Sequence, residues 1–144
     1  MEYTTRYTGG CLCGALRYEA EGPPVRAGHC YCGDCRKASG SGFIPFMGFP
    51  ASVLRFSGQT RISRAKAARG GEAVRNFCTV RGSLVFGGIV GQDDSHTIYA
   101  GSLDALRSSS RRSQSSPAIA LPGPSSRQVL QCLIRCPDEM RCVP

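Results

Sequence analysis

The chain has 144 residues, a formal net charge of +8 and nine cysteines, and its length is that of one domain. The positive charge comes mainly from arginines scattered along the sequence, which disfavours a nucleic-acid-binding face. The first residues contain no apolar signal-peptide segment, and no window is long enough to span a bilayer. We therefore expect a cytoplasmic protein without membrane attachment.

Between Tyr3 and Asp104, short runs of alternating apolar and polar residues are separated by glycine-containing breaks. This alternation, with aromatic and β-branched residues, is typical of strands and predicts an all-β fold. The clearest runs are residues 15–20, 43–49, 53–56, 83–86 and 97–100. Only residues 34–39, just after the second cysteine cluster, and the segment after Asp104 offer a helical turn. Asp34 is placed to cap the first of these turns.

The composition changes abruptly after Asp104. Every Phe and Tyr precedes residue 105, and residues 108–116 consist of Ser, Arg and Gln. Such a segment buries too little apolar surface to offset the entropy lost on ordering. We therefore divide the chain into a domain at 1–104 and an atypical Ser/Arg-rich tail at 105–144, which we expect to be poorly ordered or the product of a reading-frame shift.

Two cysteine clusters carry the strongest chemical signal. Residues 11–14 read Cys-Leu-Cys-Gly, and residues 30–35 read Cys-Tyr-Cys-Gly-Asp-Cys. In a reducing compartment, closely spaced cysteines indicate metal binding before disulfides. Thiolates from such turns can converge about 2.3 Å from one zinc ion. The alternative, that cysteines serve as small buried hydrophobic residues, fits isolated Cys78 better than it fits the clusters.

The second cluster has the pattern of a catalytic zinc site. Its cysteines, Cys30, Cys32 and Cys35, come from one short loop and leave the fourth position of a tetrahedral zinc open. Cys78 begins a further turn, Cys-Thr-Val-Arg-Gly, which has the shape of a Cys-x-x-Cys-Gly knuckle. Arg81 stands in that turn where the second sulfur would be.

Four motifs follow one another in the first 104 residues. They lie at residues 9–19, residues 29–40, Phe77-Cys78 with Gly82-Ser83, and residues 99–104. In order and content they resemble the glutathione-dependent formaldehyde-activating enzyme family, which includes the centromere protein V domain. The resemblance implies a tent-like, all-β arrangement of small sheets that holds two zinc ions, one structural and one catalytic. The cysteine ligands that it implies are Cys11, Cys13 and Cys78 for the structural zinc, and Cys30, Cys32 and Cys35 for the catalytic zinc.

Arg81 departs from the family pattern, because the implied fourth ligand of the structural zinc falls at its position. A guanidinium is permanently cationic and has no acceptor for a metal. Either this metal is held by three thiolates and another group, or it is absent. His96, Cys132, Cys136 and Cys142 are candidates for that group, and nothing in their spacing selects one.

The activity that the resemblance implies is glutathione-dependent formaldehyde activation, in which S-hydroxymethylglutathione is formed and, in a carbon-sulfur lyase reaction, cleaved. Its implied cofactor is zinc, its co-substrate is glutathione, and its catalytic residues are the cysteines of the second cluster. Because glutathione is anionic, Arg17, Arg36 and Lys37 near the motifs are candidate carboxylate contacts. Ordinary surface charge is the alternative role for these three residues.

Other functions would use the same residues. A non-enzymatic module could bind zinc and glutathione, or could bind nucleic acid or protein, as in the centromere-associated branch that the resemblance includes. The change at Arg81 and the composition of the tail also fit a degraded paralogue. Glutathione-dependent rate enhancement would distinguish the enzyme from these alternatives.

Overall fold

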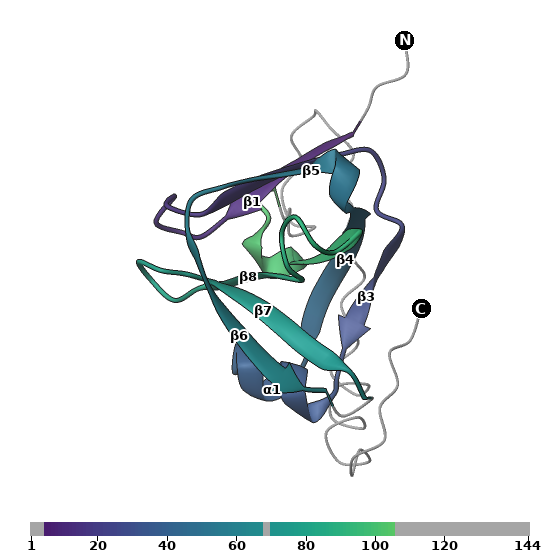
Figure 1. Cartoon of the computed structure of the whole chain (residues 1–144), viewed down its shortest axis with the longest axis vertical. Coiled ribbons are helices and arrows are strands. Elements are labelled where there is room, and N and C mark those ends of the chain that lie inside the picture. Colours follow the sequence, from purple (N-terminus) through teal and green to yellow (C-terminus); the bar gives the residue numbers. More distant parts are fainter. Residues whose placement is uncertain (1–4, 68–69, 106–144) are drawn as a thin grey trace, which may run out of the picture.

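Strands dominate the part of the chain that the structure, a computed structural model, describes, which is residues 5–67 and 70–105. They form a three-stranded sheet and a six-stranded sheet. In Figure 1 the three-stranded sheet lies at one end of the molecule and the only helix longer than one turn among the described residues lies at the other. The predicted all-β class is therefore confirmed.

The three-stranded sheet is antiparallel and has the order β1-β2-β5. Its strands are β1 (Arg6–Gly10), β2 (Arg17–Glu21) and β5 (Leu54–Ser57). Along β2 the side chains alternate, so that Tyr18 and Ala20 are buried while their neighbours are more exposed. This period of two places one face of the sheet against the core.

The six-stranded sheet has the order β3-β4-β9-β8-β7-β6, with antiparallel neighbours throughout. Its strands are β3 (Arg26–Cys30), β4 (Ile44–Pro50), β6 (Thr60–Lys66), β7 (Glu72–Cys78), β8 (Leu84–Gly87) and β9 (Ser95–Tyr99). Strand β6 is an edge strand, and six of its seven residues are exposed.

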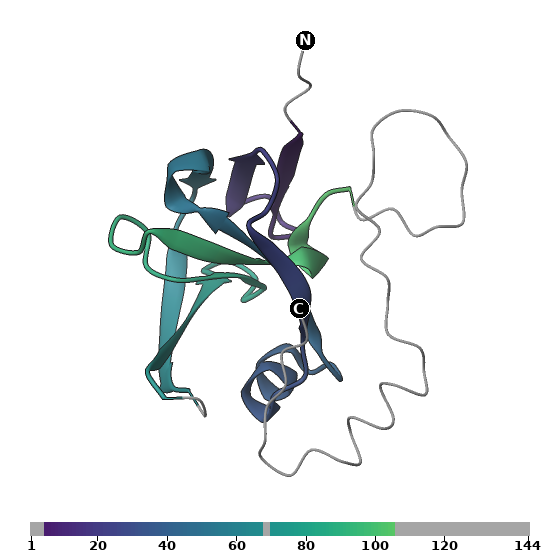
Figure 2. The same cartoon turned by 90° about the vertical axis from the view of Figure 1, so that its right-hand side faces the viewer.

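Among the described residues there are three short helical segments, two between strands and one after β9. They are α1 (Gly33–Ser39) and the 3₁₀ turns η1 (Ala51–Val53) and η2 (Ala100–Ser102). Helix α1 ends at Gly40, whose φ of 64° is left-handed and therefore favours glycine. Figure 2 shows α1 at the end of the molecule away from β1 and β2. No helix among the described residues is long and apolar enough to cross a membrane.

The core lies where the two sheets face each other. The Phe56 ring on β5 stacks on the Phe86 ring on β8, with centroids 4.1 Å apart. Tyr18, Phe49 and Ile98 are also fully or almost fully buried in the same cluster. Burial of aromatic and aliphatic side chains is worth about 1.5–3 kcal/mol each, so this cluster is the main apolar contribution to stability.

Each of the five predicted runs corresponds to a strand, but four strands were not among them. The missed strands are β1, β3, β6 and β7. Strand β3 reads Arg-Ala-Gly-His-Cys and β6 is mostly polar, so neither has the apolar alternation on which the prediction relied. The expectations for the tail fall on residues that lie outside the described ones, apart from Ala105.

Asp104 ties the end of the described chain back to the three-stranded sheet. Its carboxylate accepts hydrogen bonds from the Arg17 guanidinium, one of them at 2.9 Å, and from Thr8 Oγ1 at 2.7 Å. The backbone N–H of Asp104 also donates to Thr8 O at 2.9 Å. Arg17, followed by Thr8, lowers the pKa of Asp104.

We predict that Asp104→Asn lowers the free energy of unfolding at neutral pH by up to about 1 kcal/mol, because the pair is partly exposed to solvent. A folded-state pKa below the unfolded value stabilises the fold above the unfolded pKa, and this contribution is lost as the pH falls through the folded pKa. The difference between wild type and variant should therefore shrink in urea titrations as the pH falls from about 5 to about 3.

Asp94→Asn is the matched control, since Asp94 is an exposed acid outside the hydrogen bonds that join Asp104 to Arg17 and Thr8. It should change stability little at any pH in this range. A stability difference for Asp104→Asn that stays constant across the titration would contradict the assigned role of the ion pair.

Candidate metal centres

The first cysteine group is built from two tight turns that end strands of different sheets. Cys11 follows β1, and Gly14 N–H donates to Cys11 O at 2.9 Å with a φ of 77° at the glycine. Cys78 ends β7, and Gly82 N–H donates to Cys78 O at 2.8 Å with a φ of 71°. Each turn needs a left-handed residue, which explains why glycine follows each cysteine motif.

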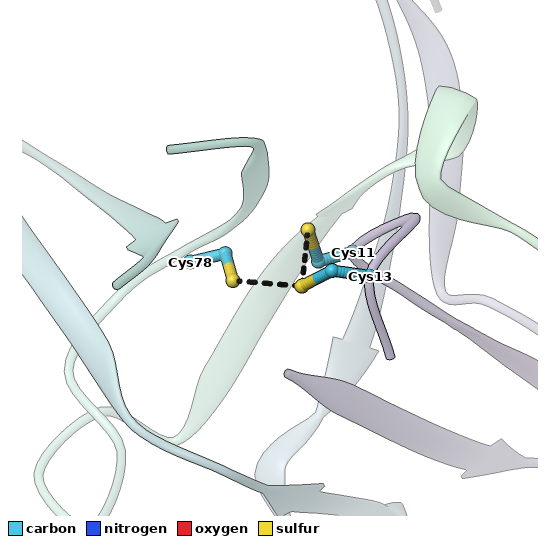
Figure 3. A group of neighbouring side chains, drawn as sticks. All are labelled: Cys11, Cys13 and Cys78. Carbon is cyan, nitrogen blue, oxygen red and sulfur yellow. Dashed lines mark hydrogen bonds between the residues drawn. The ribbon is translucent and has the colours of Figure 1, made fainter. Parts of the chain in front are cut away.

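Three sulfurs converge between these turns. Cys13 Sγ lies 3.3 Å from Cys11 Sγ and 3.5 Å from Cys78 Sγ (Figure 3). Cys11 and Cys78 are each only 2% exposed. A cluster of three thiol groups whose sulfurs lie within 4.8 Å of one another could hold a metal ion, and we call it the first triad. The isolated Cys78 of the sequence is therefore part of a cluster.

The environment of the first triad favours the thiolate form of Cys11. Ser83 Oγ lies 3.2 Å from Cys11 Sγ. This hydrogen bond, followed by one from the backbone of Cys13, lowers the pKa of Cys11 to about 6. Because the thiolate is the form that binds metals, the donor set fits a thiophilic ion such as zinc.

The described residues do not add a fourth sulfur to the first triad. Arg81 occupies the knuckle position and is exposed. His96 belongs to neither cysteine group, since its ring packs against Phe56 and Phe86 with centroids 5.3 and 6.1 Å away. The tail cysteines considered as ligands lie outside the described residues.

The second triad consists of Cys30, Cys32 and Cys35, whose sulfurs also lie within 4.8 Å of one another. Cys30 ends β3, and its Sγ is 3.5 Å from Cys32 Sγ. Cys32 is the N-cap of α1 and accepts a hydrogen bond from Cys35 N at 3.4 Å. The predicted cap, Asp34, is therefore wrong: Asp34 lies inside the first turn, and the helix starts within the cysteine cluster rather than after it.

The pKa values of two thiols in the second triad, Cys30 and Cys35, are shifted in opposite directions. A hydrogen bond with Cys30 lowers the pKa of Cys35, and the same bond, followed by burial, raises the pKa of Cys30. Arg75 Nη2 lies 4.0 Å from Cys35 Sγ and adds positive charge beside it. Within the second triad, the thiolate form is therefore more favoured at Cys35 than at Cys30.

A cavity of about 360 Å³ opens beside the second triad. Cys30 and Cys35 line it on one side, and Arg75 and Tyr99 contribute from β7 and β9. Burial raises the pKa of Tyr99 to about 12, so its hydroxyl keeps its proton near neutral pH. The cavity thus places two potential metal ligands, a cation and a hydroxyl donor around one space.

The three basic residues predicted to contact glutathione lie elsewhere. Arg17 pairs with Asp104 on the three-stranded sheet, and Arg36 and Lys37 lie on α1. None of them lines the described cavity. Sequence reasoning missed Arg75. The signal that could have identified it is a single charged residue within the otherwise uncharged run Val-Arg-Asn-Phe.

A mostly β fold with two cysteine triads, each able to hold a metal ion, defines a class of small metal-thiolate proteins. The chain belongs to the family described as "Glutathione-dependent formaldehyde-activating enzyme", whose model matches residues 6–119. The family resemblance predicted from the four motifs is therefore confirmed.

The fold resembles a solved structure. It is the crystal structure of a Rhodobacter sphaeroides protein determined as a structural genomics target, with a TM-score of 0.50 and 19% identity. The match covers 69% of this chain and 90% of that chain. At this identity the likeness concerns the fold alone. No curated protein matches the chain.

We predict that Arg81→Cys adds a fourth sulfur ligand to the first triad. The variant should retain about one more zinc ion per chain than the wild type after challenge with a mild chelator, and its melting temperature should rise, because binding to a structural zinc contributes folding energy. Elemental analysis and thermal unfolding measure the two effects. Arg61→Cys, on exposed β6, adds a cysteine outside both triads and is the control. Zinc retention and stability equal to those of the wild type would show that position 81 does not face the sulfurs.

Proposed function

We propose that the second triad binds zinc and activates the thiol of glutathione for addition to formaldehyde, with Cys30, Cys32 and Cys35 as ligands. The observation that carries the proposal is that Cys30 and Cys35 line a cavity large enough for a small substrate. Family membership supplies the thiol and the aldehyde as candidates. The first triad, which does not line this cavity, has the structural role.

The donor chemistry of the triad supports zinc. Three cysteine sulfurs from one turn and the adjoining helix leave one position of a tetrahedral ion for a substrate. When bound there, zinc would lower the pKa of a thiol brought to that open position. The hydrogen bond with Cys30, together with the nearby Arg75, lowers the pKa of Cys35 and so favours the thiolate form that binds zinc.

The remaining residues bind and orient the reactants. In the addition, the thiol gives up its proton and its sulfur forms a bond to the aldehyde carbon. The carbonyl π bond breaks and its oxygen takes up a proton, so that no proton is gained or lost overall. Tyr99, protonated near neutral pH, can donate a hydrogen bond toward the oxygen as its negative charge develops. The reverse of these steps is the carbon-sulfur lyase reaction, and holding the two reactants together in the cavity accounts for the rate gain.

We predict that Cys35→Ser loses the metal of the second triad and lowers the glutathione-dependent formation of S-hydroxymethylglutathione to the uncatalysed background. Zinc content and exchange NMR with ¹³C-formaldehyde measure the two losses. Cys13→Ser, which removes a sulfur from the first triad, is the matched control. It should lower the melting temperature and leave the rate per folded, zinc-loaded second site unchanged.

The outcomes separate the enzyme from the alternatives. Folded wild-type protein with zinc that binds glutathione but does not accelerate the reaction would be a non-enzymatic carrier. Folded protein without zinc at the second triad would contradict the proposal and would indicate a degraded family member.

A further inference from the structure

One row of residues crosses five strands of the six-stranded sheet. The strand register pairs each with the next, from β3 to β7, in the order Arg26, Gly48, Thr97, Gly87 and Arg75. Directly paired residues in antiparallel strands point to the same face of a sheet. All of these residues except Gly48 line the cavity beside the second triad. An arginine therefore stands at each end of the row.

The two glycines of the row leave room over the sheet. The side chain of Arg26 lies across Gly48, where an added Cβ would be 2.6 Å from Arg26 Nε. Arg26 Nη2 then donates to Thr97 Oγ1 at 3.2 Å. At Gly87 an added Cβ would lie 3.3 Å from the Tyr99 hydroxyl. The absence of side chains at these two glycines thus makes room for the Arg26 side chain and the Tyr99 hydroxyl, which both border the cavity.

Arg75 is the more unusual of the two arginines. It is only 8% exposed, and its Nε is buried without a hydrogen-bond partner. Burying an unsatisfied N–H of a charged group costs free energy, so such a group in a cavity wall fits a ligand that supplies the missing acceptor. The planar guanidinium offers two parallel N–H donors, which match a carboxylate.

We propose that Arg75 is a specificity-determining residue that binds a carboxylate of the thiol co-substrate, with Arg26 binding a second carboxylate at the other end of the row. The inference rests on the proposed function, and it assigns the residues by which the site would distinguish a thiol with two carboxylates from a small neutral thiol. Arg26 reaches Thr97 on β9, and the backbone of Arg75 lies two strands further along the row, about 10 Å away. The Arg75 guanidinium extends to within 4.0 Å of Cys35 Sγ, beside the second triad.

The other charges of the cavity are compatible with such a ligand. Glu72 and Asp93 also line the cavity. Glu72 accepts a hydrogen bond from Arg64 at 2.9 Å, which offsets its charge. Asp93 accepts from Ile89 N–H at 2.7 Å and keeps its negative charge available for an ammonium group. A dicarboxylate that also carries an amine therefore finds a partner of opposite charge for each of its ionised groups.

The test uses S-methylglutathione and its dimethyl ester, neither of which has a free thiol. Isothermal titration of the full chain as purified should show tighter binding of the acid than of the ester. In Arg75→Gln, affinity for the acid should fall by about 10- to 100-fold, while affinity for the ester stays within about twofold. Arg75→Lys should keep part of the preference, because it retains the charge but not the paired donors. Arg61→Gln, on exposed β6, should change neither.

Each further outcome decides the question. If the wild type fails to prefer the acid, or if Arg75→Gln keeps the full wild-type preference, the proposal is overturned. Equal loss of both ligands in Arg75→Gln, with Arg75→Lys not rescuing the acid, would assign Arg75 a purely structural role and also overturn it. Because the probes cannot react with an aldehyde, an Arg75-dependent acid preference without any rate enhancement would support this inference and contradict only the proposed function.

Discussion

Sulfur atoms that belong to different sheets meet at the first triad, and the relative placement of the two sheets depends on this meeting. Cys11 and Cys13 follow β1 of the three-stranded sheet, whereas Cys78 ends β7 of the six-stranded sheet. Thiolates this close repel one another unless protons or a cation lie among them. The proton or cation that neutralises these sulfurs therefore also holds the two sheets together at the first triad. Within the core, the Phe56–Phe86 stack joins the same two sheets.

The two triads have the same donor atoms and different surroundings. The first is enclosed by two turns, with Cys11 and Cys78 almost fully buried. The second adjoins a cavity that also contains the guanidinium of Arg75. The two triads therefore differ in their access to solvent and in their neighbouring charges, not in their number of sulfurs. These two properties are what distinguish a structural metal site from a site open to a substrate.

Sequence patterns could predict those parts of the molecule that depend on local chemistry. The strands with alternating apolar residues and the clusters with short cysteine spacing were both accessible in this way. The cavity was not, because it arises from register: Arg26 and Arg75 are far apart in sequence and share a row only when β4, β9 and β8 lie between them. Similarly, Cys78 joins Cys11 and Cys13 through a contact that spans 65 residues, and no local pattern measures such a distance.

The exposed strand β6 also affects how the molecule behaves at high concentration. Its outer edge lies at the end of the six-stranded sheet, where unpaired backbone groups could accept a strand from another chain. Arg61, Arg64 and Lys66 place positive charges along this edge, and Ile62 is its only large apolar side chain. A second copy approaching in the same way would bring like charges together. These charges therefore disfavour edge-to-edge pairing of β6 with a second copy of the chain.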